Sequence, residues 1–169
     1  LLRGYVEPEH AVMREIGAAL ESATGVRLAD APRATDGCSI PTFGIPVRAL
    51  AHAFARLGTG AGLAPERARA AARLRAAVAA APLMVAGSGR LDTRLMGHFG
   101  TRVFCKVGAE GVYCATLPET GVGIALKMDD GNTARAAEVA IVALVESLLP
   151  LDDADRAFVA PLRDVTLTN

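Results

Sequence analysis

Apolar side chains with helical spacing occupy the start of the chain. In residues 8–24 they recur three or four positions apart, which places them on one face of a helix. They are Val12, Ile16, Ala19 and Leu20. Pro8 suits the first turn of such a helix, and Gly25 suits its C-terminal cap. The pattern therefore predicts a helix over residues 8–24.

Further helices follow from the same spacing and from the prolines and glycines that bound it. They are predicted over residues 47–57, 66–81, 92–98, 133–149 and 152–159. Gly58 is the predicted stop of the first, and Pro82 is the predicted stop of the second. Residues 27–46 are dense in Pro, Gly and Asp and are predicted to form a loop, whose length favours a functional role.

Strands are predicted in the second half of the chain. They cover residues 102–106, 111–117 and 121–128, with residues 164–168 as a candidate edge strand. The turn at residues 118–121 joins two of them as an antiparallel hairpin. The apolar helix that follows is expected to lie against the sheet. This order predicts an α+β fold, with an antiparallel sheet covered by helices.

Composition narrows the classes of function. The 169 residues are 51% hydrophobic, which allows a sizeable core, and the formal net charge is +0. A balanced charge offers no general attraction to nucleic acid or to an anionic membrane, so we expect a small-molecule substrate. The longest charge-free stretch, residues 76–89, is interrupted by Pro82 and is too short to span a bilayer.

The cysteines and the chain start favour a reducing compartment. Cys38, Cys105 and Cys114 form no C-x-x-C pair, which argues against a disulfide scaffold. No signal peptide opens the sequence. We therefore expect a cytoplasmic protein. The first residue, Leu1, and the strand-like ending at Asn169 suggest part of a longer product.

Lysine is nearly absent, which draws attention to the two that occur. They are Lys106 and Lys127, while arginine supplies the other formal positive charges. A lysine can lose its proton when it is buried, whereas an arginine cannot. A lysine kept in such a composition therefore hints at a role that arginine cannot fill.

Segments in four parts of the chain resemble the bacterial L-asparaginase II family, in the family's order. They read G-Y-V-E-P-E-H at residues 4–10, T-D-G-C-S-I-P-T-F-G-I-P at 35–46, M-V-A-G-S-G-R-L-D-T at 84–93, and K-V-G-A-E-G-V-Y-C-A at 106–115. The sequences G-I-A-L-K and D-D-G come shortly after the last of these. Together the matches span nearly the whole chain, and their combination is specific.

The resemblance implies an enzyme that converts asparagine to aspartate and ammonia. The family's fold is similar to that of serine β-lactamases and glutaminases. In the family, a serine of an S-x-x-K pair is acylated, and a second serine–lysine pair assists it. A zinc ion lies close by, held by two cysteines and a lysine. The family also tends to pair, so a homodimer is expected.

Matched residue by residue, the resemblance assigns three positions directly. Lys106 corresponds to the lysine of the second pair, and it is the predicted catalytic residue. Cys38 corresponds to a zinc-ligand cysteine, and Asp36 to the acidic residue beside the metal. The predicted substrate-binding residues lie in the same matching segments and are Arg90, Gly108 and Glu110.

One departure from the family pattern is large. The chain contains no S-x-x-K and no C-x-x-K sequence. We therefore expect residues 1–169 to be the C-terminal part of a single asparaginase domain. The N-terminal part of that domain would supply the nucleophile and the remaining zinc ligands.

Each assigned residue also has a plainer interpretation. Lys106 can bind a substrate carboxylate, act as a base if desolvation removes its proton, or be an exposed charge at a strand end. Cys38 can be a zinc ligand or a small buried hydrophobe. Glu110 orients the lysine or substrate, or is a structural partner. Arg90 pairs with Asp92 or with a substrate carboxylate.

The remaining cysteines and the histidines have structural interpretations. Alternation along a strand points Cys105 and Lys106 to opposite faces, so Cys105 and Cys114 are predicted to pack in the core. The histidines have no ligand spacing and are assigned no catalysis. His10 is predicted at a helix start, His52 on a helix surface and His98 at a helix end.

The sequence thus favours asparagine hydrolysis through a serine–lysine acyl-enzyme in the full-length protein. Two alternatives stay open. One is an inactive truncated fragment, or a half that binds a partner. The other is a β-lactamase-like acyl hydrolase with another amide substrate. The preference between asparagine and glutamine is also open.

Overall fold

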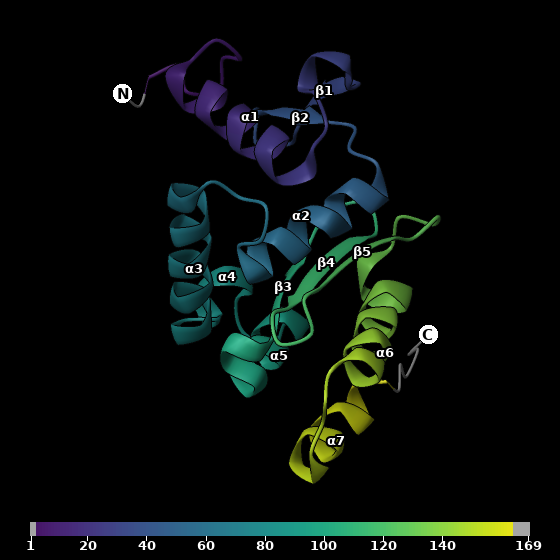
Figure 1. Cartoon of the computed structure of the whole chain (residues 1–169). Helices are drawn as coiled ribbons and strands as arrows, with labels where there is room; N and C mark the ends of the chain where they lie inside the picture. Colours follow the sequence, from purple (N-terminus) through teal and green to yellow (C-terminus); the bar gives the residue numbers. More distant parts are fainter. Residues whose placement is uncertain (1–2, 164–169) are drawn as a thin grey trace.

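The computed structural model describes residues 3–163, which fold into helices packed against two small antiparallel sheets (Figure 1). The α-helices are α1 (Ala11–Thr24), α2 (Val47–Thr59), α3 (Pro65–Ala80), α4 (Leu83–Ala86), α5 (Leu91–Phe99), α6 (Glu138–Leu148) and α7 (Asp153–Val159). The strands are β1 (Arg33–Thr35), β2 (Pro41–Phe43), β3 (Phe104–Val107), β4 (Val112–Leu117) and β5 (Val122–Lys127). The predicted α+β layout is confirmed.

The larger sheet has the order β3-β4-β5, and both strand pairs are antiparallel. The turn between β4 and β5 is closed by a hydrogen bond from the Thr120 amide to the Leu117 carbonyl at 3.2 Å, which fits the predicted hairpin. The central strand β4 is buried from Tyr113 through Leu117. Since successive side chains point to opposite faces, both faces of β4 are covered.

Helix α2 packs very closely against one face of this sheet. A Cβ atom added to Gly58 of α2 would lie 1.9 Å from the Thr116 Oγ1 atom on β4. A Cβ atom added to Gly123 of β5 would lie 2.0 Å from the Ala51 carbonyl oxygen on α2. Glycine at both positions lets the helix backbone approach the strands closely. On the same face, the Phe54 and Phe104 rings stack with centroids 5.9 Å apart.

The main core lies on the opposite face of the sheet. It joins alternate residues of β4 to the inner sides of α5 and α6. Its fully buried members include Leu95, Met96, Tyr113, Ala115, Leu117, Ile141, Val142 and Val145. The long apolar segment after the hairpin therefore packs against the sheet, as predicted. It starts with a π-helical turn, Thr133–Ala137, before α6 begins.

The structure corrects several sequence-based predictions. Helix α1 begins at Ala11 with His10 as its N-cap, so Pro8 precedes the helix. Gly58 lies inside α2 and is not its stop; Gly60 caps the helix at φ 77°. The physical reason is the contact with Thr116, which requires a residue without a side chain. The predicted loop over residues 27–46 contains the hairpin β1–β2 and a 3-10 turn, Leu28–Asp30.

Other expectations concern the ends of the chain and the membrane. The candidate strand at residues 164–168 lies outside the described residues. Helix α4 was not predicted from the sequence. Over residues 3–163, no helix combines the length and apolar character needed to cross a bilayer.

Candidate functional site

Lys106 projects from β3 into solvent. It pairs with Cys114 across the β3–β4 ladder, and its side chain is exposed. Its Nζ atom donates to the Val107 carbonyl at 2.7 Å. The preceding residue, Cys105, is 0% exposed. The predicted alternation is therefore confirmed, and Lys106 lies on the face of the sheet that carries Phe104 and α2.

A tight turn follows β3 and contains two predicted substrate-binding residues. The Gly108 amide donates to the Val112 carbonyl at 2.8 Å, and a Cβ atom at Gly108 would come within 3.0 Å of the Val112 Cβ. Glu110 has a left-handed backbone at φ 55°, followed by Gly111 at φ 73°. Within residues 3–163, no ion pair joins Glu110 to Lys106. The turn therefore leaves the Glu110 carboxylate exposed beside β3.

Asp92 is a polar core residue whose role the sequence did not indicate. It lies in the first turn of α5 and is 0% exposed. One carboxylate oxygen accepts from the Val107 amide at 2.7 Å, and the other accepts from the Tyr113 hydroxyl at 2.8 Å. Both partners come from strands that follow Asp92 in the chain. An acidic residue in the first turn of a helix ordinarily indicates only a helix start.

Arg90 lies at the N-cap of α5, directly after the predicted Gly–Ser–Gly turn. The turn has left-handed glycines at φ 88° for Gly87 and φ 72° for Gly89. The expected ion pair between Arg90 and Asp92 does not form, because the Asp92 carboxylate turns inward to its two other partners. Arg90 is exposed, and its charge acts on Glu138 of α6.

Glu138 is a half-buried carboxylate at the start of α6. Burial raises its pKa, and the nearby positive charges of Arg90 and Arg94 oppose that rise. The negative charge of Asp92 adds to it. The pKa of Glu138 is therefore set by its burial and by charges on or next to α5.

Cys38 and Asp36 lie together in the turn between β1 and β2. The turn is held by a hydrogen bond from the Asp36 amide to the Ile40 carbonyl at 2.9 Å, and by one from the Ser39 amide to the Asp36 carbonyl at 2.8 Å. Ser39 has φ 73°. The Cys38 thiol donates to the Asp36 carboxylate, with a distance of 3.2 Å between Sγ and Oδ2. Both residues are exposed, so the interpretation of Cys38 as a buried hydrophobe is wrong.

A thiol and a carboxylate in contact fit part of a zinc site. Zinc accepts cysteine sulfur and carboxylate oxygen and takes about four ligands. Over residues 3–163, no group of three or more His, Cys, Asp or Glu side chains is arranged to hold a metal ion. Cys38 and Asp36 thus provide at most half of such a set.

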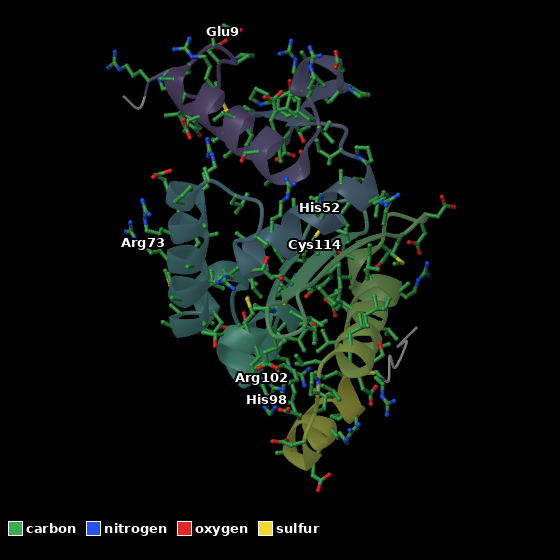
Figure 2. All side chains as sticks on the ribbon, viewed as in Figure 1. Glu9, His52, Arg73, His98, Arg102 and Cys114 are labelled. Atoms are coloured by element: carbon green, nitrogen blue, oxygen red, sulfur yellow. The ribbon has the colours of Figure 1, made fainter. Side chains whose placement is uncertain are left out.

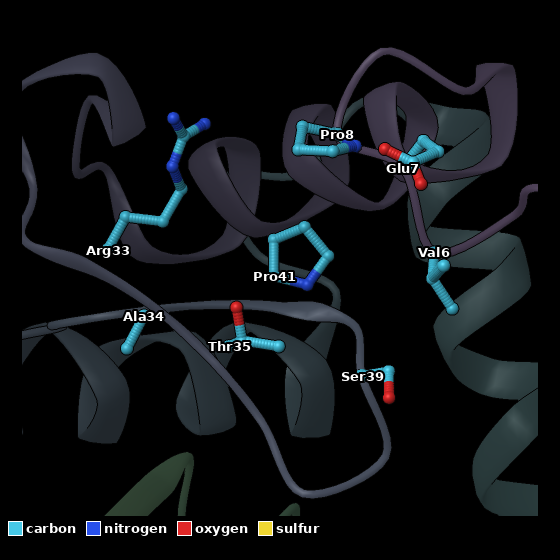
Figure 3. A pocket seen from close by; sticks show the side chains of 8 residues that line it. All are labelled: Val6, Glu7, Pro8, Arg33, Ala34, Thr35, Ser39 and Pro41. Atoms are coloured by element: carbon cyan, nitrogen blue, oxygen red, sulfur yellow. The ribbon is translucent and has the colours of Figure 1, made fainter.

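A pocket of about 320 Å³ opens beside the same hairpin (Figure 3). It is lined by Val6, Glu7, Pro8, Arg33, Ala34, Thr35, Ser39 and Pro41. Its lining combines one cation, one anion and two hydroxyl groups. In Figure 1 the hairpin lies beside α1, and α2 separates it from the larger sheet. Lys106 belongs to that larger sheet and does not line this pocket.

The two other cysteines are buried, and burial makes their thiols unreactive. Cys105 is 0% exposed and Cys114 is 4% exposed, which confirms their prediction as core residues. Burial raises the pKa of the Cys114 thiol to about 11. Burial, with the charge of Asp92, also raises the pKa of the Cys105 thiol. Cys38 is therefore the thiol of this chain that reagents and metal ions reach.

The histidines take the structural places predicted for them. His10 is the N-cap of α1 and accepts from the Val12 amide at 3.2 Å. His52 is exposed on α2. His98 lies in the last turn of α5, where its Nε2 atom is 2.8 Å from the Asp155 Oδ1 atom (Figure 2). Its ring stacks on Phe158 at 3.9 Å between centroids.

The fold and its polar groups define an α+β domain with a candidate site at the solvent-facing end of β3. The family model described as L-asparaginase II matches residues 1–169, and the chain belongs to the L-asparaginase II family. This membership confirms the resemblance found in the sequence and relates the chain to amidohydrolases that act on asparagine. A comparison with curated proteins found no match.

Proposed function

We propose that this chain forms part of an enzyme that hydrolyses the side-chain amide of asparagine. The observation that carries the proposal is the position of Lys106. Its amine is exposed at the end of β3, between the buried Cys105 and the Gly108 turn, within the segment that resembles the family's lysine motif. Membership of the L-asparaginase II family along residues 1–169 supports the same reaction.

In the proposed reaction, a serine oxygen attacks the side-chain amide carbon of asparagine. An ester bond to the enzyme forms, the carbon–nitrogen bond breaks, and the nitrogen leaves as ammonia after it gains a proton. Water then hydrolyses the ester and releases aspartate. Residues 1–169 contain no S-x-x-K sequence, and we propose that another part of the product supplies this serine.

The exposed amine of Lys106 suits the binding of an anion better than the removal of a proton. Among residues 3–163 its Nζ atom has one protein acceptor, the Val107 carbonyl, which leaves further N–H bonds to offer. We propose that these bind the α-carboxylate of asparagine. A role as a base would require a covering segment that removes water from the amine.

The neighbouring residues are proposed to shape the rest of the substrate site. Gly108 keeps the backbone next to Lys106 free of side-chain bulk, which allows a small molecule to approach. The Glu110 carboxylate can accept hydrogen bonds from the α-ammonium group of asparagine. Arg90 offers a second cation for a carboxylate. All three side chains or turns are at least partly accessible to solvent.

We also propose that Cys38 ligates a zinc ion, with Asp36 beside it. The short distance between the thiol and the carboxylate supports a shared position around one cation. Zinc would supply a Lewis acid and a fixed positive charge at the β1–β2 hairpin. Asp36 would orient the thiol or take up a ligand position itself. The remaining ligands would come from outside residues 1–169.

The test uses the complete product of the gene that encodes this chain. Ammonia release is measured with asparagine and with glutamine, and cleavage of a chromogenic β-lactam is measured in parallel. We expect ammonia release from asparagine and no β-lactam cleavage. Cleavage of the β-lactam without ammonia release would favour the other acyl hydrolase, and inactivity in all assays would favour the inactive alternative.

A further inference from the structure

The free edge of β3 presents a backbone N–H group that a side chain satisfies. In the described part of the chain, β3 pairs only with β4. The Gly108 amide donates across this ladder to Val112, so strand alternation turns the Val107 amide toward the unpaired edge. There the Val107 amide donates to Asp92 of α5 at 2.7 Å.

Asp92 is bonded through both oxygens although it is fully buried. Its second oxygen accepts from the hydroxyl of Tyr113, which is also 0% exposed. A buried carboxylate without hydrogen bonds is strongly destabilising, so each partner matters to the fold. Through these bonds the Asp92 carboxylate joins α5, β3 and β4 at one point.

The bond to Asp92 lies on the peptide unit next to Lys106. The peptide unit that starts at the Lys106 Cα atom is planar and includes the Val107 N–H group. The register pairs Lys106 with Cys114, so the β3–β4 ladder holds one side of this peptide unit, and the hydrogen bond from the Val107 N–H group to Asp92 restrains the other side. The amine itself is exposed and has no bond to another element in residues 3–163, so the backbone of β3 fixes the point and direction from which the side chain starts.

We infer that Asp92 is a positioning residue that orients Lys106 toward the substrate carboxylate, with Tyr113 holding the Asp92 carboxylate in place. This inference rests on the proposed function. It adds a functional reason for an acidic side chain inside an otherwise apolar core. Asp92 does not touch the substrate; it acts through the peptide unit between Lys106 and Val107.

A double-mutant cycle tests this inference in the complete gene product. Asp92→Asn keeps the shape of the side chain and one acceptor oxygen but removes the charge. We expect it to lower kcat/KM for asparagine by about 10- to 100-fold, because small displacements of a substrate-binding group have large effects. In the Lys106→Ala background the same change should lower kcat/KM less than about threefold.

Two further variants keep the test decisive. Tyr113→Phe removes only the hydrogen bond to the second Asp92 oxygen. It should lower kcat/KM less than Asp92→Asn does, and this loss should also shrink in the Lys106→Ala background. Thr116→Val is the control: it removes a buried hydrogen bond to the Val122 carbonyl on the same sheet. It should lower the thermal midpoint and leave kcat/KM within about twofold. An equal effect of Asp92→Asn in both backgrounds would overturn the inference.

Amide hydrogen exchange separates this inference from the proposed function. If Asp92 holds the Val107 amide, exchange at Val107 should rise about tenfold or more in Asp92→Ala and stay unchanged in Thr116→Val. This result is expected even if the parent protein releases no ammonia, which would refute only the proposed function. Unchanged Val107 exchange in Asp92→Ala would contradict the inference whatever the activity.

Discussion

Cys38 carries the solvent-exposed thiol of this chain, and that thiol contacts a carboxylate. Cys38 is exposed in the β1–β2 turn, whereas Cys105 and Cys114 are buried in the sheet. The Cys38 thiol already points at the Asp36 carboxylate. A metal ion that displaced the thiol proton would therefore meet a sulfur and an oxygen ligand on one short turn.

The zinc proposal predicts a specific difference between two cysteines. In the complete gene product, Cys38→Ala should weaken zinc binding by about 10-fold or more, because one sulfur ligand is lost. The matched control is Cys114→Ala, which removes a buried thiol and should leave zinc affinity unchanged. Competition with a chromogenic chelator measures both. Equal zinc affinity of Cys38→Ala and the parent would rule Cys38 out as a ligand.

At the scale of elements, a charged network fastens α7 to the rest of the fold. Asp155 closes a capping box with Asp152 at the start of α7. Its carboxylate is 2.8 Å from His98 of α5 and 2.7 Å from Arg102, which also bonds Glu119 in the β4–β5 turn. Figure 2 shows His98 and Arg102 close together beside α7. The Asp155 carboxylate thus contacts α5 and the 3-10 turn Gly100–Arg102, and Arg102 extends the network to the β4–β5 turn.

This network predicts a pH-dependent stability. Burial raises the pKa of Asp155, but hydrogen bonds from Arg102 and His98 outweigh it and leave the pKa below its usual value. A lowered pKa in the folded state stabilises the fold above the unfolded-state pKa, and this contribution is lost as the pH falls through the folded-state pKa. Asp155→Asn should therefore lower the free energy of unfolding by about 1–3 kcal/mol at pH 7.

The difference between Asp155→Asn and the parent should begin to shrink below about pH 4, where the carboxylate of the unfolded parent takes up its proton, and should shrink further as the pH falls through the lowered folded-state pKa. Urea unfolding at a series of pH values measures it. The exposed neighbour Asp153 provides the control, and Asp153→Asn should change stability by less than about 1 kcal/mol at any pH. A constant difference for Asp155→Asn from pH 7 to pH 3 would contradict the network.

Some elements follow from local sequence, and others depend on distant partners. The hairpin after β4 and the apolar helix after β5 were predictable, because turn residues and periodicity are local signals. The place of Gly58 inside α2 was not, since it depends on Thr116 from a strand far along the chain. The hairpin β1–β2 was missed because its three-residue strands are too short to show a pattern.

At the scale of the whole molecule, some features of the candidate site were predictable from the sequence and others were not. The exposure of Lys106 and the burial of Cys105 followed from strand alternation. The inward position of Asp92 did not, because its partners Val107 and Tyr113 come together with it only in the folded sheet. The spacing of residue types along the sequence predicts single helices and strands well, but it says little about contacts between elements.

The central claim is that Lys106 acts on asparagine, and the chain contains its own control. Lys127 is also exposed at the end of a strand, and its Nζ atom also donates to the carbonyl of the next residue. In the complete gene product, Lys106→Ala should lower kcat/KM for asparagine by about 100-fold or more, while Lys127→Ala should stay within about twofold. Similar effects of the two substitutions, or full activity of Lys106→Ala, would contradict the account.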